Sequence, residues 1–149
     1  MIVANATLSD NHFITYREQY GPTPADEVIY DGNAIGFFPA TLGNLNAQIA
    51  WRGARFGVET QYVGRIYLDN SESVDRSIGE HTVLNLSAGY RRTLPGIAVA
   101  ELSVRMFNAL DRRYETGGYT DFDALGNPFP AFIPAAQRNV LAELRFSFE

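Results

Sequence analysis

The residues that could do chemistry in this chain are few and lie far apart. The only histidines, His12 and His81, are well separated and form no ligand pair, and there is no cysteine to bind a metal or act as a nucleophile. The acidic segment 69–75 offers oxygen ligands but lacks the glycine at its sixth position that a calcium loop requires. Hydrolase, zinc-protease, phosphate-loop and dinucleotide-binding patterns are absent. The sequence therefore predicts no catalytic residue, no cofactor and no metal site, and indicates that the chain is not an enzyme.

Aromatic side chains in the last long loop, about residues 109–138, are the candidate ligand contacts. They could cap a bound ligand, but aromatic residues are also typical of a belt at a membrane interface, and the sequence leaves both interpretations open. The candidates are Tyr114, Tyr119, Phe122, Phe129 and Phe132.

The elements that must position these residues are strands, because apolar and polar residues alternate with a period of two. Five long runs show this pattern, and a sixth, less regular strand is expected at about 4–16. The runs are about 10 to 13 residues long, whereas strands of soluble proteins are most often about 5–6 residues long. A tilted strand needs about 9–11 residues to cross a bilayer. Within these runs the alternation is clearest at 45–51, 56–65, 84–91, 98–106 and 139–148.

The two faces of these runs differ in charge. The apolar face of the five runs carries no charged residue, which is informative because a charge at the bilayer midplane costs a barrel about 2–4 kcal/mol. The opposite face holds both signs. These charges could contact a plug or line a substrate path, or they could simply pair across neighbouring strands. They are Glu59, Arg65, Arg91, Glu101, Arg105, Glu143 and Arg145.

The connections alternate between short and long. Tight turns are expected at 52–54 and 93–96, and long loops at about 19–40, 68–81 and 109–138. Short turns on one rim and long loops on the other are typical of outer-membrane barrels. The expected fold class is all-β: an antiparallel transmembrane β-barrel fragment of about six strands. A net charge of -5 argues against a nucleic-acid partner.

Three local segments extend this interpretation to a family. Residues 62–70 read Tyr-Val-Gly-Arg-Ile-Tyr-Leu-Asp-Asn, residues 108–115 read Asn-Ala-Leu-Asp-Arg-Arg-Tyr-Glu, and a proline-containing stretch at 133–139 leads to Arg138. The chain ends in an aromatic-x-aromatic pattern. In order and spacing, these segments resemble the C-terminal strands of TonB-dependent outer-membrane receptors, over about residues 1–148.

The resemblance implies the C-terminal part of a larger barrel, of about 22 strands around a plug domain. On this interpretation residues 1–149 form one barrel portion, without the plug, the segment that binds the TonB energy-coupling complex, or a signal peptide. The implied function is uptake of a scarce nutrient such as a ferric siderophore across the outer membrane of a Gram-negative cell. Partners would be that nutrient, outer-membrane lipid, the energy-coupling complex and the barrel-assembly machinery. The assembly machinery would engage the terminal strand through Leu144, Phe146 and Phe148, although here Glu149 follows the last aromatic residue.

Two other architectures share the two-sided pattern. A small soluble β-barrel that binds an apolar ligand would keep the apolar face inside. A complete small outer-membrane barrel of about eight strands, without a transport role, would suit the length of the chain. Strand length, loop asymmetry and the family-like segments favour the receptor.

Overall fold

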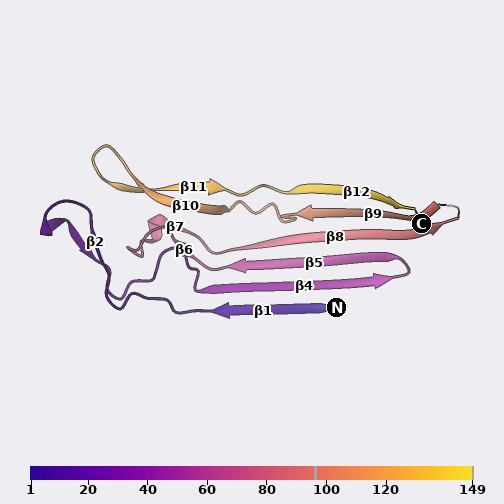
Figure 1. Ribbon diagram of the computed structural model, residues 1–149, viewed down its shortest axis with the longest axis horizontal. Helices are drawn as coiled ribbons and strands as arrows, with labels where there is room; N and C mark the ends of the chain where they lie inside the picture. The colour runs from indigo at the N-terminus through magenta and orange to yellow at the C-terminus, as the bar shows by residue number, and fades with distance from the viewer. Residues whose placement is uncertain (96, 149) are drawn as a thin grey trace.

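The computed structural model describes residues 1–95 and 97–148, which form an open antiparallel sheet with long loops at one end (Figure 1). Each strand of this sheet pairs with the next strand of the same sheet along the chain, in the order β1-β4-β5-β8-β9-β12. The strands are β1 (Ile2–Leu8), β4 (Thr41–Trp51), β5 (Ala54–Val63), β8 (His81–Leu94), β9 (Ile97–Phe107) and β12 (Asn139–Ser147). The sheet does not close on itself, so the expected barrel fragment is an open segment.

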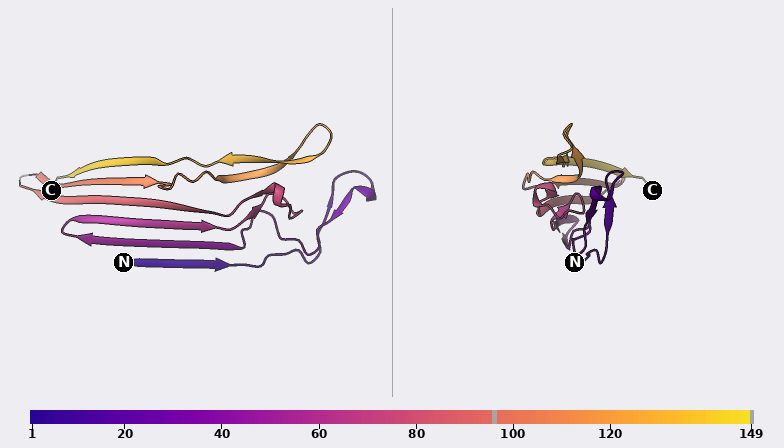
Figure 2. Two further views of the ribbon diagram at one scale, coloured as in Figure 1. Left: turned by 180° about the vertical axis from the view of Figure 1, so that it is seen from behind. Right: turned by 90° about the vertical axis from the view of Figure 1, so that its left-hand side faces the viewer.

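The turns and loops alternate as the sequence predicts. β4 and β5 are joined by Arg52 and Gly53, which both have positive φ angles, of 48° and 86°. Positive φ at both central residues is the conformation of a type I′ turn, whose twist matches that of the strands. The β8–β9 turn lies at the same rim, as does the end of β12, and the long loops lie at the opposite rim (Figures 1 and 2). Gly96, in the second predicted tight turn, lies outside the described residues.

The register places the apolar residues of all the strands in continuous rows. Residues directly opposite one another on neighbouring strands share a face of the sheet. The middle row crosses all six strands without one polar residue: Ile2, Ala47, Val58, Leu86, Met106 and Val140. Hydrophobic alternation therefore sets this register, because a shift of one residue would move every apolar side chain to the other face.

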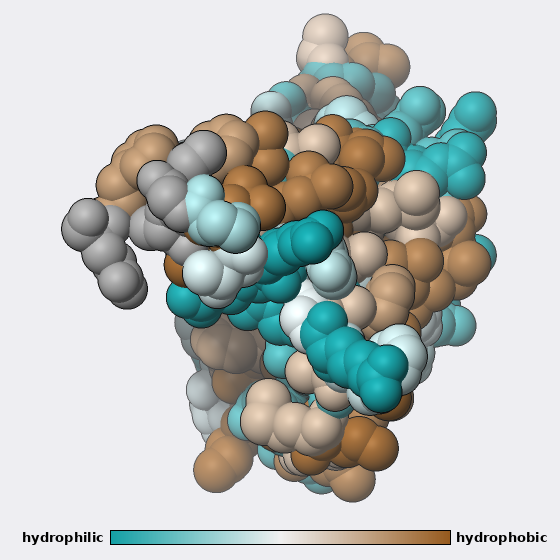
Figure 3. Space-filling view, turned by 90° about the vertical axis from the view of Figure 1, so that its right-hand side faces the viewer, coloured by the Kyte–Doolittle hydropathy of each residue, from teal (hydrophilic) through white to brown (hydrophobic). Residues whose placement is uncertain are grey.

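This apolar face is not covered by any other layer. Ile49, Phe56 and Leu144 have exposed fractions of 67%, 58% and 60%, and Figure 3 shows hydrophobic surface beside hydrophilic surface at the short-turn rim. The only buried apolar residues among those described are Tyr30, Leu68 and Ile78, all in the long-loop segments. The packed interior thus lies among the loops, and the sheet face is left available to its surroundings. In the described part of the chain, no helix has the length and apolar character to span a membrane.

Two boundaries differ from the prediction. The sixth strand is β1, which ends at Leu8, so the expectation of a strand over 4–16 was wrong. Beyond Leu8 the polar Ser-Asp-Asn sequence interrupts the alternation, and the chain bonds to its own loop instead, as when the Phe13 amide donates to Asn33 O (2.9 Å). In addition, β8 continues to Leu94, which places Arg92 on the apolar face opposite Ala100. A long side chain at the rim can extend its charged end to water while its stem stays on apolar surface.

The three long connections are not featureless loops. The first, 9–40, contains the short pair β2 (Arg17–Gln19) and β3 (Glu27–Ile29), and the second, 64–80, contains β6 (Ile66–Tyr67) and β7 (Ser77–Ile78). The third, 108–138, contains a hairpin of β10 (Glu115–Phe122) and β11 (Pro128–Pro134). The sequence did not predict these pairs, because they are short and rich in glycine and proline.

Candidate functional site

Asp69, in the second long loop, forms a hydrogen-bonded node between loops. Arg76 Nε donates to Asp69 Oδ2 at 2.6 Å, and the Thr120 hydroxyl of β10 donates to the same oxygen at 2.6 Å. The Ser71 amide and hydroxyl donate to Oδ1. Partial burial raises the pKa of Asp69, but these hydrogen bonds outweigh that effect and lower it from 3.8 to about 2. Asp69 is therefore a charged anchor between the second and third loops, and not the freely solvated loop residue that its sequence context suggests.

The residues that follow Asp69 hold the first loop in the same way. The Asn33 side chain donates to Asn70 O (2.9 Å), and the Gly36 amide donates to Asn70 Oδ1 (3.2 Å). The Ala34 amide donates to Glu72 (3.3 Å). The first and third long loops are thus both attached to one short segment of the second loop, 69–72, whose first two residues end the family-like sequence at 62–70.

Asn108 forms a second node, where β9 ends. It is 3% exposed and has a φ of 49°. Its side-chain amide donates to Arg112 O (2.8 Å) and Ala136 O (3.3 Å), its side-chain oxygen accepts from the Arg112 amide (2.9 Å), and its own amide donates to Asn85 (3.0 Å). Asn108 therefore ties the end of β9 to β8 through its backbone amide and to the segment before β12 through its side chain. The family-like segments 108–115 and 133–139 are therefore in contact at Asn108.

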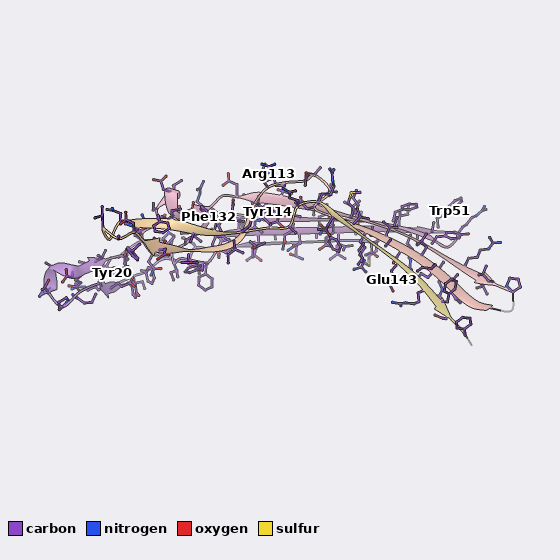
Figure 4. All side chains as sticks on the ribbon, turned by 90° about the horizontal axis from the view of Figure 1, so that it is seen from above. Tyr20, Trp51, Arg113, Tyr114, Phe132 and Glu143 are labelled. Atoms are coloured by element: carbon purple, nitrogen blue, oxygen red, sulfur yellow. The ribbon has the colours of Figure 1, made fainter. Side chains whose placement is uncertain are left out.

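The five candidate aromatic residues do not gather in one cluster. In the β10–β11 register, Phe122 and Phe132 share the hairpin face of Thr120, whereas Tyr119 and Phe129 lie on the opposite face. These four side chains are between 43% and 53% exposed. Tyr114 lies at the base of the loop and stacks on His81, with ring centroids 4.5 Å apart. Figure 4 shows Tyr114 and Phe132 at separate places along the loop.

The first loop has an aromatic cluster of its own. Phe13 stacks on Tyr16 (4.4 Å between centroids), and Tyr16 stacks on Tyr30 (6.1 Å). The Tyr20 and Tyr30 hydroxyls share a hydrogen bond of 2.9 Å. Burial, the hydrogen bond from Tyr30 and the neighbouring Glu18 together raise the pKa of Tyr20 above its ordinary value. The Tyr20 phenol therefore stays neutral at physiological pH, and Tyr30, which is buried, anchors the cluster within the loop.

The polar face of the sheet carries a hollow lined by residues of β4, β5, β8, β9 and β12. Arg55 of β5 reaches over β8 to an ion pair with Glu101 of β9. Gly89 of β8 lies beneath this crossing, since a Cβ atom there would be in ordinary van der Waals contact with Arg55 Nε, at 3.9 Å. Arg145 and Glu143 pair along β12 (2.8 Å), and in Figure 4 Glu143 and Trp51 project to opposite sides of the sheet. Of the charges named from the sequence, Glu101, Glu143, Arg145 and Arg65 form ion pairs, but none of these pairs joins neighbouring strands of the sheet as the pairing hypothesis predicts.

The terminal strand presents its apolar residues on the uncovered face. Leu144, Phe146 and Phe148 are 60%, 50% and 75% exposed. β12 pairs with β9 on one side only, and its other edge has no partner strand among the described residues. Glu149, which follows the last aromatic residue, lies outside the described residues.

Metal-ligating groups do not assemble anywhere in 1–95 or 97–148. No cluster of three or more histidine, cysteine or acidic side chains occurs in these two ranges.

Comparisons with known proteins give matches by structure and none by sequence. No family model and no curated protein matches the chain. The sheet superimposes on the ferric preacinetobactin receptor BauA of Acinetobacter baumannii with a TM-score of 0.56 and 15% identity, covering 78% of this chain. It superimposes on the ferric yersiniabactin uptake receptor FyuA of Yersinia pestis with a TM-score of 0.55 and 22% identity, again covering 78% of this chain.

The chain has the fold of a siderophore-receptor barrel segment. It spans 16% and 17% of the length of the two receptors, so it corresponds to a small part of each. The resemblance expected from the sequence is thereby confirmed at the level of the fold, and the fold class is confirmed with it. Both neighbours are receptors by name, which agrees with the absence of enzyme motifs from the sequence.

Sequence reasoning missed the structural roles of Asp69 and Asn108. The sequence points to Asp69 only as a possible oxygen ligand in an acidic loop, and to both residues as parts of family-like segments. For Asn108 a signal was available, because asparagine is one of the few residues that adopts positive φ readily, and it directly follows a long alternating run. No local signal identifies Thr120 as the partner of Asp69, since that contact joins residues far apart in the sequence.

Proposed function

We propose that residues 1–149 form the C-terminal part of the β-barrel of a TonB-dependent outer-membrane receptor. The receptor takes up a scarce nutrient, of which a ferric siderophore is the best-supported class. The structural similarity to two ferric siderophore receptors supports this proposal.

One observation carries the membrane assignment: the uninterrupted apolar row across six strands, on a face that nothing covers. In water, such a face is unfavourable by about 25 cal/mol for each Å² of apolar surface. In a bilayer it is the surface that contacts lipid tails. The opposite face of the sheet, with its ion pairs and amides, then faces a water-filled lumen.

The two edges of the sheet support the idea of a larger barrel. β1 and β12 each have one side without a partner strand among the described residues. An unpaired backbone group in hydrocarbon costs several kcal/mol, which makes an open sheet edge untenable in a membrane. We infer that further strands continue the sheet from these edges and close it.

The partners follow from this arrangement. Ligand would be captured at the long-loop rim, where Tyr114, Tyr119, Phe122, Phe129 and Phe132 are the candidate contacts. The energy-coupling complex would act through a plug outside these residues. The barrel-assembly machinery would engage β12 through Leu144, Phe146 and Phe148.

The first test is the reading frame around Met1 in the source genome. An in-frame extension that encodes a plug and further alternating strands is the expected result. The complete reading frame is then expressed in a Gram-negative host that lacks its own ferric siderophore receptors. Siderophore-dependent growth under iron limitation supports the proposal, whereas absence of the product from the outer-membrane fraction contradicts it.

A further inference from the structure

At the long-loop end of the sheet, one short segment links the three long loops. The segment Asp69–Glu72 contacts both other long loops, through Asn33, Ala34 and Gly36 on one side and through Thr120 on the other. The segment is itself held by the β6–β7 pair, since the Leu68 amide donates to Arg76 O (2.9 Å). These hydrogen bonds therefore join the three loops through one common segment.

We infer that Asp69 is a positioning residue, which holds the β10–β11 hairpin and thereby fixes the shape of the ligand-binding rim. The inference rests on the proposed function, because it concerns the rim at which the receptor would capture its ligand. Asp69 itself does not contact the ligand in this account. It acts through Thr120 and, with it, through the aromatic side chains of the hairpin.

Close packing beside the hydrogen bond supports this role. Leu68 is 2% exposed, and a Cβ atom at Gly118 would lie 3.1 Å from one of its methyl groups and 2.7 Å from Ala131 O. Only glycine lets β10 approach so closely, which brings Thr120 within reach of Asp69. The hairpin is thus seated by shape at Gly118 and by a charge-assisted hydrogen bond at Thr120.

The arrangement also separates the two faces of the hairpin. Thr120 and Gly118 face the anchor, together with Phe122 and Phe132, whereas Tyr119 and Phe129 face away from it. A hairpin that detaches from Asp69 would lose this fixed orientation, and the energetic cost of ordering it would then reduce the ligand affinity. In this account Asp69 connects the geometry of the hairpin to ligand capture without touching the ligand.

The anchor persists over a wide pH range. The depressed pKa of Asp69 means that its carboxylate is charged throughout the physiological range, so its bonds to Arg76 and Thr120 are present there. The side chains of Asp69 and Arg76 are only 22% and 19% exposed, so solvent screens this pair less than a surface pair.

The test uses the protein from the complete reading frame in lipid nanodiscs. Two substitutions cut the connection from opposite sides: Asp69→Asn removes the charge, and Thr120→Val removes the hydroxyl with little change in shape. Asp75→Asn is the matched control in the same loop, because Asp75 is exposed and makes no hydrogen bond among the described side chains. Thr116→Val is the control in the hairpin, where the Thr116 hydroxyl bonds only to Ile133 O within the same hairpin.

The first measurement is amide hydrogen exchange of residues 115–134. Asp69→Asn and Thr120→Val are expected to accelerate it by about tenfold to hundredfold, the range for loss of one hydrogen bond to a charged group. The controls are expected to leave it unchanged. Unchanged exchange in both anchor variants would overturn the inference.

The second measurement is the affinity for ferric siderophores, tested over a panel of hydroxamate and catecholate types. Both anchor variants are expected to weaken the binding of any ligand that the unmodified protein binds. The double variant should be no weaker than Asp69→Asn alone, because both changes remove the same connection. A simple loss of folding would instead reduce the amount of protein in the membrane and give additive effects.

The two measurements separate the two claims. If the unmodified protein binds no siderophore, the proposed function fails, and hydrogen exchange still decides whether Asp69 holds the hairpin. If exchange accelerates as expected while the affinity for a bound siderophore stays the same, the positioning role is overturned.

Discussion

The two faces of β4 provide a sharp prediction, because neighbouring residues on this strand point to different environments. Ala47 lies in the middle apolar row, between Ile2 on β1 and Val58 on β5. Gln48 is the next residue, is exposed, and faces the polar side. Replacing each by arginine adds the same side chain one position apart. Alanine has almost no side chain to lose, so Ala47→Arg isolates the effect of adding the charge.

The magnitude follows from the position in the sheet. The Ala47 row is the middle one of the apolar band between the two rims, where arginine on a lipid face costs about 2–4 kcal/mol. Gln48→Arg keeps a long polar side chain in a wet hollow, so its cost should stay within about 0.5 kcal/mol. A difference of about 2–4 kcal/mol changes the folding equilibrium by a factor of about 30 to 1,000.

The assay is urea unfolding of the complete protein in lipid vesicles, compared between the two variants. A lower midpoint for Ala47→Arg, with Gln48→Arg close to the unmodified protein, is the expected result. Equal midpoints, or a larger loss for Gln48→Arg, would refute the assignment of the two faces.

Three further predictions follow from single positions. Gly89→Leu should block the ion pair that crosses β8 and lower the unfolding free energy by up to about 1 kcal/mol, since the pair is partly exposed. In a double-mutant cycle with Glu101→Gln, the two losses of unfolding free energy should not add. Full additivity would show that the ion pair does not contribute to the effect of Gly89→Leu. Gly53→Ala should lower the urea midpoint by more than Gly32→Ala, although both glycines have φ above 80°. The reason is that a Cβ atom at Gly53 would lie 2.5 Å from a backbone oxygen of β8, whereas nothing lies within 4 Å of one at Gly32. Equal shifts of the midpoint would contradict this. The contribution of Asp69 to loop stability should be present in full above pH 3.8 and disappear as the pH falls through about 2, because its pKa is lowered on folding. If protection of the hairpin from hydrogen exchange were already lost near pH 5, the lowered pKa of Asp69 would be contradicted.

The sheet could be predicted well from the sequence because its determinants are local. Alternation in the runs around Trp51, Leu86 and Leu144 specifies both the strands and their faces, and a two-residue turn at Arg52–Gly53 specifies one pairing. Antiparallel neighbours joined in chain order then leave a single arrangement, an up-and-down sheet. The proposed membrane surroundings also rest on the sequence, since long strands with an almost uncharged face are typical of membrane barrels.

The error at the N-terminal strand shows where this reasoning stops. Hydrophobic residues such as Phe13 and Tyr16 suggested that the strand continues, but their apolar surface packs within the first loop instead. A sequence pattern records that a residue prefers burial, but not which neighbour will bury it. The end of β1 at Leu8 depends on the packing of Phe13 and Tyr16 within the loop rather than along the sheet.

The candidate site could be predicted only in part for the same reason. The loop aromatics could be named from their residue types, but their division between two hairpin faces depends on the register of β10 and β11. The contacts of Asp69 with Thr120, and of Asn108 with Ala136, join distant parts of the chain. Their partners are fixed by the tertiary fold, which no local pattern encodes.

The most direct test of the central claim is a cysteine scan along β4 in the outer membrane. The 149 residues contain no cysteine, so each introduced thiol is unique within the chain. Single cysteines replace residues 45–49 in turn, and each is tested for labelling by a membrane-impermeant maleimide and, after attachment of a fluorophore, for quenching by brominated lipid. We expect Leu45, Ala47 and Ile49 to report lipid and Asn46 and Gln48 to report water. Loss of this alternation, or water at all five positions, would contradict the assignment of the chain to a membrane barrel.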